Sequence, residues 1–294
     1  MSAVVQSTSP AGLLGGAPRK RRRWSPAQAW GTILLAPYVL VFLFFVIYPV
    51  GYGLWLARSP ASYVQLFEDD IFLRAIGNTL IFLLVGVNLK MIAALFLSGF
   101  LMMQRPWIRV LSLLFILPWA LPSIPTILSF RFMLNPEWGL VNQIIFRLTG
   151  EDGPNWLNEP SLALSLAILV HIWKSLPFWT LILISGRLAI AGDLYEAAAI
   201  DGANKWQQFR FITWPSIQTL YVTCTILSMI WTLGDFNSVY LLTGGGPADL
   251  THVLATLGIR YLRLDQVSLS LASIVCALPL VLPLAYVMMK RLSR

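Results

Sequence analysis

Long apolar stretches alternate with short polar stretches along most of the chain. Each apolar stretch holds about twenty or more residues with few charges, which is the length that an α-helix needs to cross a lipid bilayer. A helix satisfies its backbone groups within one segment, so a stretch of this kind is expected to be helical in lipid. Six membrane spans are predicted, at residues 31–57, 75–101, 107–134, 161–185, 217–242 and 268–290.

The composition supports this prediction. Of the 294 residues, 57% are apolar and only 12% are charged, which is more apolar surface than a soluble domain buries. We therefore expect an all-α membrane protein with six transmembrane helices. The formal net charge of +8 would suggest nucleic acid in a soluble protein, but the basic residues lie mainly at the ends of the spans. We expect no nucleic-acid partner and interpret the charge as a signal of topology.

Basic residues are distributed unevenly between alternate loops. With both termini in the cytoplasm, the cytoplasmic segments hold thirteen basic and three acidic residues, and the outside segments hold six basic and nine acidic residues. This asymmetry agrees with the positive-inside rule. Residues 1–30 are expected to be a cytoplasmic segment without a cleavable signal peptide, disordered at 1–18 and carrying five consecutive basic residues at 19–23. Residues 31–294 form the predicted membrane domain.

Proline is frequent inside the predicted spans, at positions 37, 49, 118, 122, 125, 177, 279 and 283. Each proline removes a backbone hydrogen bond, so kinked or locally broken helices are expected. Broken helices are tolerated where protein or a water-filled cavity meets the freed carbonyls. The third span, with three prolines, is the first candidate to line a path across the membrane.

Polar and charged residues inside the spans have two possible interpretations. Charges are costly in lipid and tend to face a cavity or a partner. Lys90 or Lys174 could pair with Asp235 and contribute only to packing. Alternatively, these residues could line a transport cavity in which amides and aromatic ring faces bind a sugar-like solute. The candidate pathway residues are Asn88, Lys90, Trp119, Lys174, Asp235 and Asn237.

The chain has no recognisable pattern for catalysis, for a metal or for a nucleotide. His171 lies in a span and His252 in an outside loop, far from any cysteine or carboxylate pattern, and both are interpreted as structural. Cys224 and Cys276 are interpreted as packing residues. The Gly-Gly-Gly-Pro run at 244–247 lacks the lysine and hydroxyl residue of a phosphate-binding loop. It is expected to be a flexible outside turn or a contact for a substrate-delivery protein.

A polar island at residues 190–216 separates the fourth and fifth spans. Residues 196–199 favour a helix, Asp201-Gly202 favours a turn in which glycine accepts a positive φ, and residues 205–212 can resume as a helix until Pro215. The segment therefore predicts helix, turn, helix. Small alanines leave room for a partner to approach, and Phe209 and Ile212 place an apolar pair on one face.

This island resembles the cytoplasmic coupling loop of ATP-binding-cassette (ABC) importer permeases. The matching positions are Glu196, Ala197, Ala198, Asp201, Gly202, Ala203, Phe209, Ile212 and Pro215. Three further stretches extend the resemblance to the carbohydrate-uptake, maltose/glycerol-phosphate-type and binding-protein-dependent branch. They are Asn78-Thr79, the stretch from Leu117-Pro118-Trp119 to residues 135–142, and residues 240–247.

The resemblance implies the permease subunit of an importer for a carbohydrate, polyol or related solute in the bacterial inner membrane. In this family the coupling loop docks in a groove of a separate ATPase subunit, where Glu196 would meet a basic residue and Gly202 would make the bend. The implied partners are a second permease subunit, which would form a heterodimer with this chain, two ABC ATPase subunits and an extracytoplasmic solute-binding protein. This chain would be no enzyme and would hold no cofactor, because ATP and Mg²⁺ would be bound by the ATPase subunits.

Three alternatives remain open. The importer could carry a non-sugar solute such as a peptide or an ion. The chain could be a stand-alone secondary transporter or channel, which would leave the island at 190–216 unexplained. It could also be a membrane scaffold without transport activity.

Overall fold

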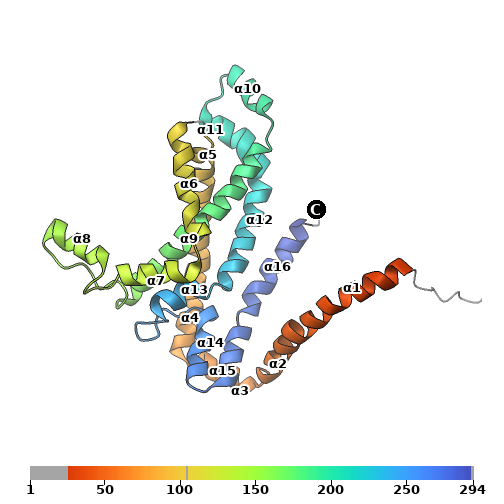
Figure 1. The fold of residues 1–294 in the computed structure, drawn as a ribbon, viewed down its shortest axis with the longest axis vertical. Coiled ribbons are helices and arrows are strands. Elements are labelled where there is room, and N and C mark those ends of the chain that lie inside the picture. Colours follow the sequence, from red (N-terminus) through yellow and green to blue (C-terminus); the bar gives the residue numbers. More distant parts are fainter. Residues whose placement is uncertain (1–25, 104, 293–294) are drawn as a thin grey trace, which may run out of the picture. The chain divides into compact units, whose positions relative to one another are not determined.

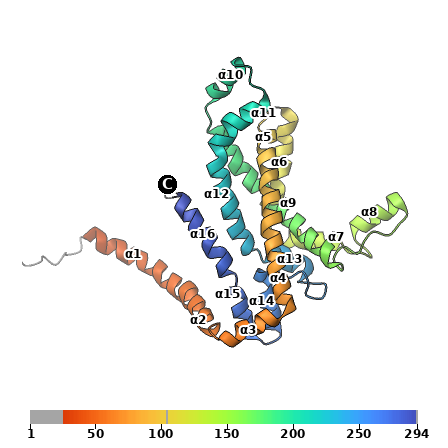
Figure 2. The same cartoon turned by 180° about the vertical axis from the view of Figure 1, so that it is seen from behind.

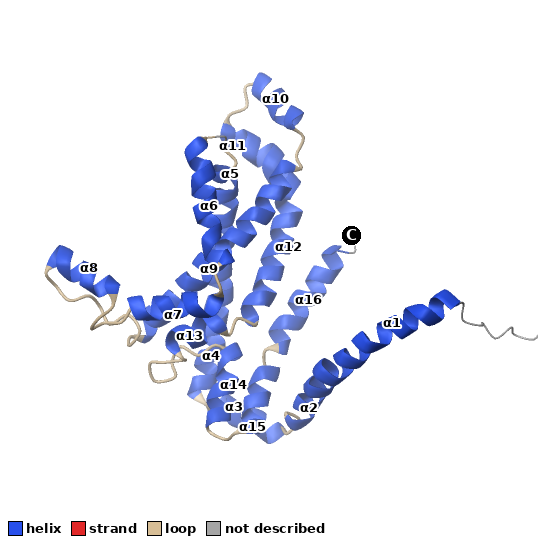
Figure 3. Cartoon of the chain, viewed as in Figure 1, coloured by secondary structure: helices blue, strands red, loops and turns tan. Residues whose placement is uncertain are grey.

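The computed structural model describes residues 26–103 and 105–292, and within them every regular element is a helix (Figures 1 and 3). The all-α prediction is therefore confirmed. The α-helices are α1 (Pro26–Phe42), α2 (Tyr48–Leu56), α3 (Pro60–Glu68), α4 (Asp70–Ile81), α5 (Asn88–Leu101), α6 (Pro106–Ala120), α7 (Ser123–Met133), α8 (Leu140–Thr149), α9 (Pro160–Leu188), α10 (Gly192–Ile200), α11 (Lys205–Gln208), α12 (Trp214–Leu233), α13 (Asn237–Thr243), α14 (Leu254–Arg263), α15 (Val267–Val275) and α16 (Leu278–Leu292). Three π-helical segments join some of them: η1 (Leu43–Ile47), η2 (Phe82–Val87) and η3 (Phe209–Thr213).

Among the described residues, five helical stretches are long and apolar enough to cross a membrane. They are Trp30–Leu56, Asp70–Leu101, Pro160–Leu188, Lys205–Leu233 and Val267–Arg291. The pair α6 and α7 makes a sixth candidate, in which the two helices are bent by 98° relative to each other. The number of spans and their order agree with the prediction.

The structure differs from two of the predicted spans. Helix α12 stops at Leu233, whereas the fifth span was predicted to continue to residue 242. Gly234 caps α12, and the Asp235 carboxylate accepts a hydrogen bond from the Ser238 backbone amide in the first turn of a separate helix, α13. The sixth span contains a turn at Cys276-Ala277, next to Pro279, which lacks the N–H that would continue the helix.

The chain divides into two compact units, Met1–Tyr52 and Gly53–Arg294. In the first unit the structure describes residues 26–52, a helical stretch whose apolar side chains from Trp30 onward are exposed. Exposed apolar side chains on such a helix are suited to lipid or to another membrane subunit. The predicted disordered segment at 1–18 and the basic residues at 19–23 lie outside the described residues.

The second unit packs around α9, which lies beside α5, α6 and α12 (Figures 1 and 2). One apolar cluster joins α5, α9 and α12 through residues such as Met91, Trp179 and Cys224. A Cβ atom at Gly186 would lie 2.3 Å from a methyl group of Leu220. Glycine therefore allows α9 and α12 to approach closely, as small residues do in membrane bundles.

The third span is broken, as its prolines predict. Helix α6 ends at Ala120, Leu121 and Pro122 are extended, and α7 begins at Ser123. The Lys174 amino group of α9 donates hydrogen bonds to the freed carbonyls of Pro118 and Leu121, at 2.9 and 2.7 Å. By contrast, α9 continues as one helix through Pro177. A proline in a span is therefore not enough to break it here, and the break in the third span is held by a cation from a neighbouring helix.

Candidate functional site

The island at 190–216 folds as a helix, a turn at Gly202 and a second helix, as its sequence predicts. The second helix does not stop at Pro215, as was expected, but continues through η3 into α12 as far as Leu233. Gly202 has a φ of +79°, which a residue with a Cβ rarely adopts. The turn is closed by hydrogen bonds from the Gly202 amide to the Ala199 carbonyl, at 3.1 Å, and from the Ala203 amide to the Ala198 carbonyl, at 2.9 Å. The loop lies at one end of the second unit, beyond the ends of α9 and α12 (Figure 1).

A capping box starts the second helix of this loop. The Asn204 side-chain oxygen accepts a hydrogen bond from the Gln207 backbone N–H at 2.9 Å. The Gln207 side-chain oxygen accepts one from the Asn204 backbone N–H at 2.8 Å. Our sequence reasoning missed this box, although the Asn-x-x-Gln spacing is its usual signal. The loop is also tied to itself, since the hydroxyl groups of Tyr195 and Thr213 lie 2.8 Å apart.

The outer face of the loop combines acidic and apolar side chains. Glu196 and Asp201 are exposed, and so are Leu194, Ile200 and Trp206. Phe209 and Ile212, the predicted apolar pair, are partly buried against the bundle. Large apolar side chains that a fold leaves uncovered next to charges are typical of a protein-binding surface. The loop is thus hydrogen-bonded within itself, and one of its faces is exposed.

A cavity of about 230 Å³ is lined by residues of α5, α7, α9 and α12 and by the segment from Asp235 to Ser238. Four of the six candidate pathway residues line it: Lys90, Lys174, Asp235 and Asn237. The other two are not among its lining residues. The Asn88 amide donates to the Leu84 carbonyl of its own helix, and Trp119 stacks on Phe178 with ring centroids 5.6 Å apart.

Three ionisable side chains form a buried chain of contacts at this cavity. The Lys90 amino group lies 3.0 Å from Nε2 of His171, and Nδ1 of His171 lies 2.6 Å from the Asp235 carboxylate. If Lys90 donates to Nε2, then Nδ1 carries the proton and donates to Asp235. The suggested pairing of Lys90 with Asp235 therefore occurs through a histidine. The spacing along the chain did not reveal this contact between α9 and the residues after α12.

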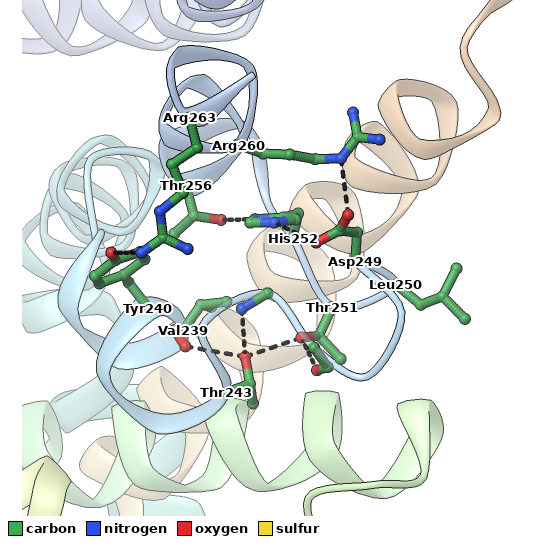
Figure 4. Close-up of polar contacts among 12 residues, drawn as sticks. Val239, Tyr240, Thr243, Asp249, Leu250, Thr251, His252, Thr256, Arg260 and Arg263 are labelled. Carbon is green, nitrogen blue, oxygen red and sulfur yellow. Dashed lines mark hydrogen bonds and ion pairs between the residues drawn. The ribbon is translucent and has the colours of Figure 1, made fainter. Parts of the chain in front are cut away.

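The loop around residues 244–247, which the sequence suggested to be a flexible turn, makes several hydrogen bonds to neighbouring residues (Figure 4). The Thr251 hydroxyl donates to the Gly246 carbonyl at 2.6 Å and lies 2.9 Å from the Thr243 hydroxyl. The Asn78 side chain donates to the carbonyls of Leu250 and His252, both at 2.9 Å. One residue of the second span thus holds the loop on both sides of Thr251.

His252 is buried in this loop at only 2% exposure. Its Nδ1 lies 3.0 Å from the Thr256 hydroxyl, and its Nε2 lies 3.4 Å from the Asp249 carboxylate (Figure 4). Burial lowers the pKa of His252, and the positive charges of Arg260 and Arg263 lower it further, while Asp249 opposes them. The neutral imidazole is therefore the form that this loop accommodates.

Replacing Lys90 with methionine should strongly destabilise the protein. It would leave Asp235 and His171 with an uncompensated buried charge, and breaking a buried pair on one side costs about 3–5 kcal/mol. The double variant Lys90→Met, Asp235→Asn removes both charges and should recover most of the loss. Thermal unfolding, monitored by tryptophan fluorescence, checks this prediction. A double variant that loses as much stability as Lys90→Met, or the sum of the two single losses, would contradict it.

Lowering the pH from 7 to 5 should destabilise the protein through His252. Because the pKa of His252 is lower in the folded state, the unfolded chain takes up the proton at a higher pH than the folded protein does. The free energy of unfolding is therefore unaffected by this histidine above about pH 6.5 and decreases below that pH. Each unit of difference in pKa is worth about 1.4 kcal/mol. The loss on acidification should be smaller in His252→Gln, measured as unfolding temperature against pH. An identical pH dependence in both proteins would refute a role for this histidine.

Comparisons with known proteins agree with this geometry. The family model described as "Binding-protein-dependent transport system inner membrane component" matches residues 90–294. The trehalose/maltose transport system permease protein MalF of Thermococcus litoralis is 31% identical over 273 residues, covering 88% of this chain and 92% of that protein. The sulfoquinovosyl glycerol transport system permease protein SmoG of Agrobacterium fabrum is 35% identical over 239 residues, covering 76% and 77%.

A solved structure has the same fold. It is a chain of a bacterial ABC transporter involved in the import of the acidic polysaccharide alginate, with a TM-score of 0.75 and 24% identity, covering 90% of this chain and 96% of that one. The family match extends over more than half of the chain and includes the cavity, the loop at 190–216 and the loop between α13 and α14. The chain is a multi-pass membrane permease and belongs to the family of inner membrane components of binding-protein-dependent transport systems.

Proposed function

We propose that this chain is a permease subunit of an ATP-driven importer for a carbohydrate, polyol or related solute. The observation that carries the proposal is the loop at 190–216. It is a helix, turn and helix held by internal hydrogen bonds, and it exposes a face of acidic and apolar side chains. A separate ATPase subunit, which binds ATP and Mg²⁺, would cover this face. The transport of trehalose and maltose, or of sulfoquinovosyl glycerol, by relatives supports a saccharide as cargo.

The remaining assembly follows from the same proposal. A second permease, a different chain carrying its own coupling loop, would complete the transmembrane part as a heterodimer. A solute-binding protein would dock outside, and both termini would lie in the cytoplasm of a bacterium, with the spans in its inner membrane. ATP-driven closure of the ATPase subunits would move both coupling loops and open the cavity outward. Nucleotide shifts this equilibrium only if it favours the outward state differentially.

The cavity at α9 and α12 is the proposed solute path in this subunit. It offers an amide at Asn237, charged groups at Lys174 and Asp235, and an aromatic face at Trp231. The Ser228 hydroxyl, which also lines it, is buried and has no hydrogen-bond partner among the described residues. Buried polar groups are normally satisfied, so a solute hydroxyl or a water molecule is the expected partner.

The coupling role is tested by ATPase activity of the complex in lipid discs, with its binding protein and a panel of neutral and acidic sugars and polyols. One class of solute should stimulate the wild type. Glu196→Ala removes the exposed carboxylate, and Gly202→Asp forces a Cβ and a charge onto a φ of +79°. Both should lose the stimulation while the complex stays assembled, whereas Glu151→Ala, an exposed outside carboxylate, should keep it.

Undiminished stimulation in both coupling-loop variants would remove the basis of the proposal and favour a membrane scaffold. Solute uptake by the chain without any ATPase subunit would favour a stand-alone secondary transporter. Stimulation by peptides or ions in place of sugars would leave the importer in place and change its cargo.

Asn237→Ala should raise the apparent KM for the stimulating solute by about 2–10-fold, which corresponds to the loss of one hydrogen bond of roughly 0.5–1.5 kcal/mol. Basal ATPase activity should be unchanged, because no contact to the coupling loop is altered. Asn88→Ala is the matched comparison, since it removes the same amide from a span at a position outside the cavity. Equal effects of the two substitutions on KM would argue against this cavity as the solute path.

A further inference from the structure

Arg187 joins three segments at the coupling-loop end of the bundle. It lies one residue before the end of α9. Its Nε donates to the Ser98 hydroxyl and its Nη2 to the Leu95 carbonyl, both at 2.9 Å and both on α5. The guanidinium carbon also lies 5.8 Å from the ring centroid of Phe209, in the coupling loop. One side chain thus bridges the loop and a helix that is distant from it in sequence.

The guanidinium of Arg187 makes charge-assisted hydrogen bonds to α5, which are roughly twice as strong as bonds between neutral groups. The Leu95 carbonyl also accepts a hydrogen bond from the Ser98 hydroxyl at 2.7 Å, so the two groups that Arg187 contacts are themselves joined. Ser98 is fully buried, and a Cβ atom at Gly99 would lie 3.4 Å from the guanidinium. The planar guanidinium therefore lies directly on α5 over a residue without a side chain. A lysine would keep the charge but lose the fixed fork of donors.

Helix α5 leads from this contact to the cavity. It is continuous from Asn88 to Leu101, so Ser98 lies roughly 12 Å along the helix from Lys90 at a rise of about 1.5 Å per residue. Lys90 in turn contacts His171 and, through it, Asp235. A displacement of Phe209 that moves Arg187 would therefore shift a rigid helix that forms part of the cavity wall.

We propose that Arg187 is a positioning residue that transmits movement of the coupling loop, at Phe209, to α5 and so to the cavity. This inference rests on the proposed coupling function. Without Arg187 the loop would remain connected to the bundle through α9 and α12, but its contact with α5 through Arg187 would be lost. Coupling between nucleotide and cavity opening should weaken, while ATP binding and hydrolysis persist.

The test measures cavity opening directly and needs no knowledge of the solute. The complex is prepared in right-side-out membrane vesicles, with Cys224→Ala and Cys276→Ala to remove the native thiols and Ser123→Cys to place a reporter thiol at the cavity. The rate of reaction with a membrane-impermeant maleimide is measured with and without ATP and vanadate inside. Basal ATPase activity and copurification of the ATPase subunits are followed in parallel.

Nucleotide should raise the reaction rate in the otherwise native complex. Arg187→Leu should reduce that increase about fivefold or more, within the usual range of coupling free energies, with basal ATPase activity and assembly retained. Arg187→Lys should give an intermediate value. Ser98→Ala should lower the nucleotide-dependent increase partially. Combined with Arg187→Leu, it should cause no further reduction. Arg109→Leu, an exposed arginine of α6, is the control for lost positive charge and should behave as the native complex.

The outcomes separate this inference from the function on which it rests. If Gly202→Asp abolishes the increase and Arg187→Leu leaves it intact, the role of Arg187 is refuted and the coupling function stands. If nucleotide has no effect even in the native background, or Gly202→Asp does not change its effect, the coupling function itself fails. If the complex with Arg187→Leu does not assemble, the variants Arg187→Lys and Ser98→Ala provide the test. A nucleotide-dependent increase in reaction rate equal to the native one in both variants would refute the inference.

Discussion

A charge buried in a membrane bundle must find a partner on another helix, and the second unit depends on this requirement. Lys90, His171 and Asp235 come from α5, α9 and the segment after α12, and each satisfies its neighbour. Removing any one would leave a charge or a polar ring without compensation. The chain of contacts therefore ties together the helices whose apolar side chains also pack against one another, and it does so at the wall of the cavity.

The same requirement applies at the helix ends and breaks. Lys174 donates to the carbonyls that are freed where the third span is broken. Asn78 donates to two carbonyls of the loop between α13 and α14. In each case a side chain from one span satisfies the backbone of another segment. Irregular backbone is thus accommodated because protein donors replace the water that lipid lacks.

The local features of the fold were predictable from sequence, and the contacts between distant segments were not. Apolar length predicts the spans, three prolines predict the broken helix, and Asp201-Gly202 predicts the turn. The pairing of His171 with Lys90 and Asp235 joins residues 81 and 64 positions apart, and no periodicity encodes it. The end of α12 was missed because apolar residues continue beyond Gly234, so apolar length alone does not mark the end of the helix. Of the candidate pathway residues, spacing alone could not distinguish Asn88, which bonds to its own helix, from Asn237, which faces the cavity.

The loop between α13 and α14 is anchored to the second span by the Asn78 carboxamide. Both N–H groups of this carboxamide are used, one on each side of Thr251, so residues 250–252 are attached to the span at two points. Displacing this segment relative to the span therefore costs at least one hydrogen bond, and a substitution at residue 78 would affect a loop that lies more than 170 positions later in the chain.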